Sequence, residues 1–183
     1  MQYTPYSFVP KKGCIMNNAS AEVASAANYR DSIRLFTVAP YSSTAPHGAP
    51  GPTEQQELQS VELKWTPASP HVVGAQGRFT TFSAICWLYG KHLHNKLGVP
   101  VGLVSSAVGG TNIGAWSPLG STESCNATGR AKNGGSLANT MIYPFSVGPM
   151  GFTTAIWYQV RAITQPGIGY RRFDHPFMFP RAG

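Results

Sequence analysis

The stretch FTTFSAICWLYGKHLHNKLGVPVGLVSS, residues 79–106, decides the fold class because a helical pattern passes directly into a strand pattern. In its first part apolar residues recur every three or four positions, which predicts one buried face of a helix. Gly98 is typical of a helix end, and Pro100 prevents the helix from continuing. The run at 101–106 is apolar without alternation, which favours a parallel strand buried on both faces. The predicted helical face comprises Phe79, Phe82, Ile85, Cys86, Tyr89, Leu93 and Leu97.

Four further elements are predicted upstream of this stretch. The Ala-rich residues 18–29 indicate a short helix, with Glu22 near its start, where the helix dipole favours negative charge. β-Branched and aromatic residues at 33–38 predict a strand. A segment rich in Pro, Gly and Ser at 40–55 indicates a surface loop. Alternating apolar and polar residues at 61–67 predict a short edge strand.

Downstream, residues 136–145 indicate a short helix that ends near Pro144, and residues 153–158 indicate another buried strand. Residues 160–183 show no sustained period, so we expect an irregular tail. Strands that alternate with helices favour an α/β fold, here part of a three-layer α/β/α sandwich around a parallel sheet. The chain has 183 residues and no visible internal repeat, which suits a single domain.

The charge balance is basic, since 14 Lys and Arg oppose 7 Asp and Glu for a net charge of +7. These charges are scattered and are not interleaved with aromatic residues, so we expect no nucleic-acid partner. No stretch reaches the roughly 18 uncharged apolar residues of a membrane helix, so we expect no membrane partner. The first residues also lack the apolar core of a secretory signal.

Cysteines and sequons bear on the compartment. Cys14, Cys86 and Cys125 are an odd number, with neither a CxxC motif nor zinc-ligand spacing. Two Asn-x-Ser/Thr triplets begin at Asn18 and Asn126 and are candidate glycosylation sites. Such triplets suit a secreted or lysosomal protein, although they also arise by chance.

Two adjacent glycines, Gly109 and Gly110, follow the strand predicted at 101–106. In an open parallel sheet, ligands bind beyond the carboxyl ends of the strands. Glycines there allow backbone N–H groups to approach a ligand oxygen closely, as in an oxyanion hole. The alternative is a strand-to-helix turn in which glycine only relieves strain. A phosphate loop is disfavoured, because the stretch fits neither the P-loop nor the GxGxxG pattern.

Four stretches share the pattern of one known family. They read NASAEVASAANYRDSIRLFTV (18–38), FSAICWLYGKHLHNKLGVPVGLVSSAVGGTNIGAWSP (82–118), LANTMIYPF (137–145) and AIWYQ (155–159). These stretches resemble the sialate O-acetylesterase family, whose members carry FSA, CW, PVGL, GGT and AW in this order. The resemblance implies a partial domain of that family over residues 1–159, from which the tail at 160–183 departs.

The resemblance implies a flavodoxin-like SGNH-type hydrolase that uses no metal and no cofactor. Its members remove acetyl esters from sialic acid hydroxyls, so the expected partner is O-acetylated sialic acid or a sialoglycan. The family's chemistry implies a serine activated by a histidine and an aspartate, with an oxyanion hole built from three loops. The family's usual location, lysosomal or secreted, is the expected location here.

The same resemblance assigns roles to four residues. Gly109 and Gly110 match the glycine donor of the oxyanion hole, and Gln159 matches a glutamine beside another donor. Trp116 matches a family tryptophan, for which sugar contact and simple packing both remain open. The family usually reads GGTPIEAW, whereas this chain has Asn112 in place of the proline and Gly114 in place of the glutamate.

The family's nucleophile and base have no match in this sequence. The serine motif Gly-Gln-Ser-Asn-Met is absent, and Met1 resembles its final residue. No Asp-x-x-His motif is present, since the aspartates are Asp31 and Asp174. We therefore expect a chain truncated at both ends, without triad-dependent turnover and with low stability and solubility. The alternatives are a non-catalytic fragment with weak carbohydrate binding and a basic interaction module.

Three residue pairs invite a substitute role, and each has a plainer interpretation. Adjacent residues rarely orient a carboxylate onto the neighbouring imidazole, so we interpret Asp174 and His175 as a solvated loop pair. A His-x-His pair on a helix points to different sides, so we interpret His92 and His94 as surface residues. Without a base to activate them, Ser105 and Ser106 are interpreted as strand-end hydroxyls.

Overall fold

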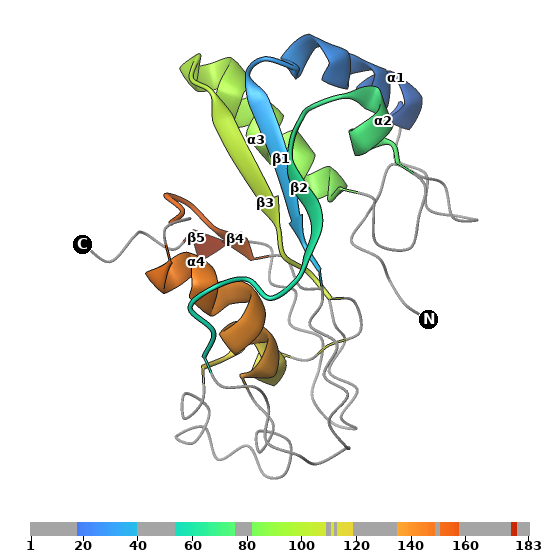
Figure 1. Cartoon of the computed structure of the whole chain (residues 1–183). Coiled ribbons are helices and arrows are strands. Elements are labelled where there is room, and N and C mark those ends of the chain that lie inside the picture. Colours follow the sequence, from blue (N-terminus) through green and yellow to red (C-terminus); the bar gives the residue numbers. More distant parts are fainter. Residues whose placement is uncertain are drawn as a thin grey trace, which may run out of the picture.

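A small mixed sheet organises the chain (Figure 1). Its strands β1 (Ile33–Val38), β2 (Val61–Pro67) and β3 (Val101–Ser105) lie in the order β2-β1-β3. β1 and β3 are parallel, whereas β1 and β2 are antiparallel. The computed structural model describes residues 18–39, 54–75, 82–108, 111, 113–118, 135–148 and 151–157, and the backbone of 177–178.

The predicted strand at 33–38 and the predicted edge strand at 61–67 are confirmed. The predicted parallel sheet is confirmed in part, because β1 and β3 run parallel whereas β2 runs antiparallel to β1. An antiparallel strand at the edge of a parallel pair is a common arrangement in mixed sheets. The described part of the chain is therefore a mixed α/β structure with a partly parallel sheet and flanking helices.

The apolar side chains of the central strand β1 are buried on both faces of the sheet. Ile33 and Leu35 belong to one hydrophobic cluster, and Phe36 and Val38 belong to a second. β3 divides in the same way, with Leu103 in the first cluster and Val104 packed against the second. The sheet thus separates two cores.

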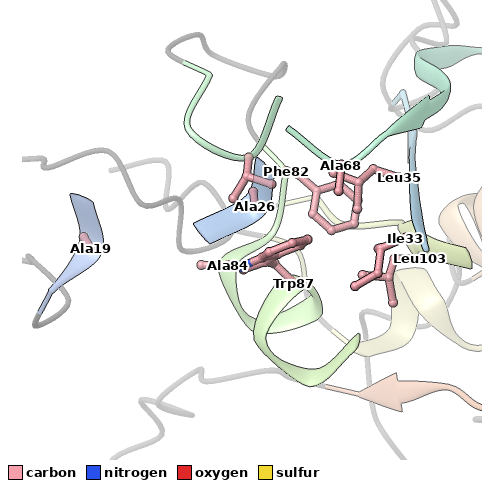
Figure 2. Close-up of a cluster of buried hydrophobic side chains, with 10 residues drawn as sticks. Ala19, Ala26, Ile33, Leu35, Ala68, Phe82, Ala84, Trp87 and Leu103 are labelled. Carbon is pink, nitrogen blue, oxygen red and sulfur yellow. The ribbon is translucent and has the colours of Figure 1, made fainter. Parts of the chain in front are cut away.

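Helices cover the first cluster. They are α1 (Ala19–Ser25) with the 3₁₀ turn η1 (Ala26–Tyr29), α2 (Pro70–Val73) and α3 (Ala84–Leu97). The predicted helix at 18–29 is thereby confirmed. Figure 2 shows the rings of Trp87 and Phe82 among the residues of this core, which include Ala26, Ile33, Leu35, Ala68 and Leu103.

Local signals set the ends of α3. The Ser83 side chain accepts a hydrogen bond from the Cys86 N–H at 3.3 Å, which satisfies one of the free donors of the first turn. At the other end Gly98 has φ 69°, a left-handed conformation that glycine adopts without strain. Its N–H donates to the His94 carbonyl at 2.8 Å.

The buried face of α3 differs from the predicted one. Ala84, Trp87 and Gly90 are the buried residues of this helix, whereas Leu97 is 57% exposed. The helix approaches β3 so closely that a Cβ at Gly90 would overlap the Leu103 side chain. Trp87 and the two small residues Ala84 and Gly90 therefore define the contact face, and the predicted residues Ile85, Cys86, Tyr89 and Leu93 are only partly buried. Phe82 is fully buried but precedes the helix, and Phe79 lies outside the described residues.

The helix at 136–147 does not end at Pro144, which corrects the prediction. It contains a π-helix, η5 (Ala138–Ile142), followed by α4 (Tyr143–Val147). The Tyr143 N–H bonds the Ala138 carbonyl, five residues back, and this wide turn accommodates a proline that would clash in a regular α-helix. Asn139, whose carbonyl would next require the missing N–H of Pro144, accepts instead from the Gln55 N–H at 3.0 Å.

The predicted buried strand at 153–158 is much shorter in the structure. Of residues 153–157, only Ile156–Trp157 form a strand, β4, which is partly buried. Thr153 and Thr154 are exposed. β4 pairs antiparallel with β5 (Phe177–Met178), a short strand within the tail that was expected to be irregular. No described helix combines the length and the hydropathy that a membrane span requires.

Candidate functional site

The candidate site begins where β3 ends and is closed by side-chain hydrogen bonds. The Ser106 hydroxyl donates to the Met141 carbonyl at 3.0 Å, which ties the strand end to η5. The Thr111 hydroxyl donates to the Val108 carbonyl at 2.7 Å. The Trp116 indole N–H donates to the Thr111 hydroxyl oxygen at 2.8 Å. The Trp116–Thr111–Val108 hydrogen bonds join residues on the two sides of the glycines in sequence.

Gly109 and Gly110 themselves lie outside the described residues, as do Asn112, Asn126, Gln159, Asp174 and His175. The oxyanion-hole roles of Gly109, Gly110 and Gln159 therefore stay predictions. The structure does place the flanking residues Val108 and Thr111, whose mutual hydrogen bond holds the two ends of the glycine segment close together.

Trp116 ends a 3₁₀ turn, η2 (Ile113–Trp116), and is partly buried against the second hydrophobic cluster. Its ring meets the ring of Trp157 edge to face, with the centroids 5.9 Å apart and the planes at 83°. This geometry is favourable for aromatic pairs and brings β4 to the end of β3. Trp116 thus packs against Trp157, a partner that the sequence pattern did not reveal.

The strand-end serines serve structural roles in the described part of the chain. Ser105 is buried at 6% exposure, and the Ser106 hydroxyl is engaged with the Met141 carbonyl. Both observations fit the interpretation of these serines as strand-end hydroxyls. Thr37 lies beside Ser105 in the parallel register, and its buried hydroxyl oxygen has no hydrogen-bond partner among the residues that the structure describes. No sequence signal indicated this residue.

Among the residues that the structure describes, no group of three or more His, Cys, Asp or Glu side chains is placed to bind a metal ion. His92 is exposed on α3. The Nδ1 atom of His94 lies 2.7 Å from the Val99 carbonyl oxygen, and its ring packs edge to face on Tyr29. His92 therefore faces solvent, and His94 contacts the chain just beyond the end of α3.

Within the described part of the chain, two titratable side chains have raised pKa values. Burial raises the pKa of Cys86 to about 12, so this thiol is protonated and unreactive at neutral pH. The hydrogen bond to the Glu54 carboxylate, together with its negative charge, holds the pKa of Tyr143 above its usual range. Neither group has the properties of an activated nucleophile.

The comparison with known proteins matches these features to one family. Human sialate O-acetylesterase is 33% identical to the chain over 153 residues, which are 78% of this chain and 27% of the human protein. The chain is a distant homologue of the sialate O-acetylesterases over this part of their length. The mouse sialate O-acetylesterase is 38% identical over 108 residues, 59% of this chain and 18% of the mouse protein. The resemblance predicted from the motifs is confirmed.

A solved structure of a related class of enzyme is also similar to the chain. A carbohydrate acetylesterase from Xanthomonas citri superposes with a TM-score of 0.50 and 27% identity over 73% of this chain and 26% of that chain. No family model matches the sequence. The chain spans about a quarter of the length of the curated relatives and of the solved structure that it matches.

Proposed function

We propose that this chain provides the oxyanion-stabilising side of a hydrolase site that removes O-acetyl groups from sialic acid hydroxyls. The observation that carries the proposal is the hydrogen-bonded segment beyond the carboxyl end of β3. There Ser106 bonds Met141, and Thr111 bonds both Val108 and Trp116, in a chain homologous to the sialate O-acetylesterases. The carboxyl end of a parallel strand is where ligands bind in open α/β sheets.

In this proposal the backbone N–H groups of Gly109 and Gly110 donate to the oxygen that becomes negative when the acetyl carbon turns tetrahedral. Such donors stabilise the transition state because their positions are set before the reaction begins. The side-chain amide of Gln159 provides a further donor. Trp116, which is only partly buried, forms the sugar-facing edge of the segment and is held in place by Thr111 and Trp157.

The parallel pair β1 and β3 is, in the same proposal, part of a larger flavodoxin-like α/β/α sandwich. Support comes from the helices that pack against both hydrophobic clusters of the sheet and from the match to the Xanthomonas citri acetylesterase. The lysosomal or secreted location expected from the family belongs to this proposal as well.

We further propose that the 183-residue chain alone does not turn over esters. Its sequence contains neither the Gly-Gln-Ser-Asn-Met motif nor an Asp-x-x-His motif. The hydroxyl of Ser106 is held by a backbone carbonyl, and the thiol of Cys86 is protonated. Oxyanion donors without a nucleophile and base leave at most a small residual rate.

The test is acetate release by the purified 183-residue chain from an aryl acetate and from O-acetylated sialic acid. We expect the rate to equal that of the matched variant Ser105→Ala/Ser106→Ala and of buffer alone. Turnover that rises in proportion to folded protein would overturn the proposed inactivity. If that turnover persists in the double variant and is lost in His175→Asn, the Asp174–His175 pair is the base.

The non-catalytic alternative makes a different prediction in the same samples. A chain that binds carbohydrate weakly should show a saturable change in tryptophan fluorescence with O-acetylated sialic acid, and Trp116→Phe should reduce it. Trp65→Phe is the matched control, because Trp65 lies on β2 and is 45% exposed.

A further inference from the structure

An exposed tryptophan, Trp65, lies across the face of the sheet that carries Phe36. Its ring packs on the Phe36 ring, with the centroids 5.2 Å apart and the planes at 41°. It also reaches the next strand, since a Cβ placed on Gly102 of β3 would lie 3.2 Å from the Trp65 ring. Trp65 is 45% exposed, whereas Phe36 is 5% exposed. The indole therefore crosses β1 from β2 to β3 and keeps a large part of its surface open to solvent.

An irregularity in β2 accompanies this orientation. Between the pairs Leu35–Thr66 and Thr37–Leu63, β1 has one residue and β2 has two, one of which is Trp65. Two residues opposite one form a β-bulge, which bends the strand and changes the direction of a side chain. Bulges are frequent beside functional sites, so this one draws attention to the aromatic face that it presents.

A guanidinium starts beside this aromatic face. Arg34 precedes Phe36 by two residues on β1, so its side chain emerges on the same face, and in the parallel register it pairs with Gly102. Neighbouring strands lie about 4.8 Å apart, so Arg34 starts one strand spacing from the point that the indole covers. Arg34 is exposed, and its Nη1 donates to the Arg30 carbonyl at 2.6 Å. Among the described residues no carboxylate pairs with Arg34, which leaves further N–H donors for an anion.

We propose that Trp65 and Arg34 form a binding site for a hexuronic acid residue of a glycan. A hexuronate ring has faces of C–H groups, one of which packs on the indole. Its carboxylate is an equatorial substituent, so it lies near the plane of the sugar ring and reaches sideways to the guanidinium. Arginine donates two parallel hydrogen bonds to a carboxylate, which fixes the orientation of the sugar. An aromatic surface with a few polar groups beside it is typical of a small-molecule site.

This site is separate from the candidate site at the carboxyl end of β3. Gly102 lies near the start of β3, whereas Ser106 follows its last residue. Both sites lie on the same side of the sheet, because Trp116 packs against the hydrophobic cluster that contains Phe36. The choice of a sugar as the occupant rests on the proposed function. Sialic acid fits the Trp65 site less well, because its carboxylate is on the fully substituted anomeric carbon and a three-carbon side chain extends from its ring.

Ligand-observed saturation-transfer NMR on the full chain tests the site. The probes are methyl β-D-glucuronide and methyl β-D-glucoside, a neutral sugar with the same ring. We expect the glucuronide to bind saturably and about tenfold more tightly, because the glucoside lacks the charge-assisted hydrogen bonds to Arg34. Arg34→Gln should remove this preference by weakening only the glucuronide. Lys96→Gln, which removes the same charge from an exposed position on α3, should bind both sugars like the wild type.

Substitutions at residue 65 separate stacking from folding. Trp65→Ala should abolish the binding of both sugars, whereas Trp65→Phe keeps a ring against Phe36 and should retain most of it. Urea unfolding of each variant shows that the chain is folded when it is tested. Trp116→Phe should leave glucuronide binding unchanged, so a failure of the proposed ester site is distinguishable from a failure of this one.

Four results would overturn the proposal. They are equal binding of the two sugars by the wild type, no binding of either sugar, a preference for a methyl α-sialoside over the glucuronide, and wild-type affinity in Arg34→Gln. Displacement of the glucuronide by an excess of glucuronate, and not by an acidic peptide at the same concentration, would support the sugar as the occupant. Stronger binding of the acidic peptide would assign the surface to a protein partner and refute the proposal.

Discussion

At the scale of single residues, Glu22 connects α1 to α3 through Trp87 and Lys91. Its carboxylate accepts the Trp87 indole N–H at 2.9 Å and forms an ion pair with Lys91, with the two charged side chains 19% and 14% exposed. Burial acts to raise the pKa of Glu22, but the hydrogen bonds from Lys91 and Trp87 and the charge of Lys91 outweigh it, and the pKa is lowered. The pair therefore stabilises α1 against the core.

Replacing this carboxylate should cost stability in a pH-dependent way. We expect Glu22→Gln to lower the free energy of unfolding by about 1–3 kcal/mol at pH 7, because Lys91 loses its partner in a largely buried setting. Since the folded-state pKa of Glu22 is depressed, the contribution is complete above the unfolded pKa and is lost as the pH falls through the folded pKa. Urea unfolding at pH 7 and in acid measures both effects.

The control is Glu57→Gln, the same change at an exposed glutamate, which should shift stability by less than about 0.5 kcal/mol. Equal urea midpoints for Glu22→Gln and wild type at pH 7 would contradict the prediction. So would a difference that is undiminished in acid.

At the scale of elements, the contact between α3 and β3 depends on a glycine, Gly90, whose lack of a side chain lets the helix approach the strand. Gly90 is buried where the helix crosses Leu103, and a Cβ there would overlap the leucine. Glycine is unfavourable inside a helix by about 1 kcal/mol relative to alanine, so its presence indicates that close packing outweighs helix propensity. The same closeness directs Trp87 into the core.

Gly90→Ala should therefore destabilise the chain by about 1–3 kcal/mol in spite of alanine's better helix propensity. Removing one methylene from the opposing residue relieves the overlap, so Gly90→Ala/Leu103→Val should lose less stability than the sum of the two single variants. Thermal and urea unfolding of the four proteins measure this coupling. Additive effects, or a more stable Gly90→Ala, would show that the helix does not press on Leu103.

At the scale of the whole molecule, the described sheet ends in open edges. β2 pairs only with β1 among the described strands, and its residues Val61 and Trp65 are 37% and 45% exposed. An apolar edge strand offers unpaired backbone groups to other chains, so it favours association. This agrees with the low solubility expected of the chain when it is expressed alone.

A charge on this edge should reduce self-association. We expect Val61→Lys to increase the monomer fraction at a given concentration, measured by size-exclusion chromatography with light scattering. Leu97→Lys is the matched control, because Leu97 is 57% exposed at the end of α3 and away from the sheet edge. An equal increase of the monomer fraction in both variants would show that the effect comes from net charge and not from the sheet edge. A wild-type chain that is monomeric with a sharp, cooperative thermal transition would contradict the prediction.

Local sequence determined much of the element map. The β-branched run at 33–38 and the alternation at 61–67 predicted β1 and β2 at their observed bounds, and Gly98 with Pro100 predicted the end of α3. These signals act within a few residues through backbone preference. The family motifs likewise predicted the homology to sialate O-acetylesterases that the relatives confirm.

The tertiary structure decided what depends on contacts between distant residues. The buried face of α3 follows from the approach of Gly90 to Leu103, and the direction of β2 follows from its pairing with β1. At the candidate site the motifs indicated Trp116, but its pairing with Trp157 connects positions 41 residues apart. The periodicity of apolar residues in the sequence predicts which side chains are buried. Which side chains contact one another depends on close packing in the folded structure.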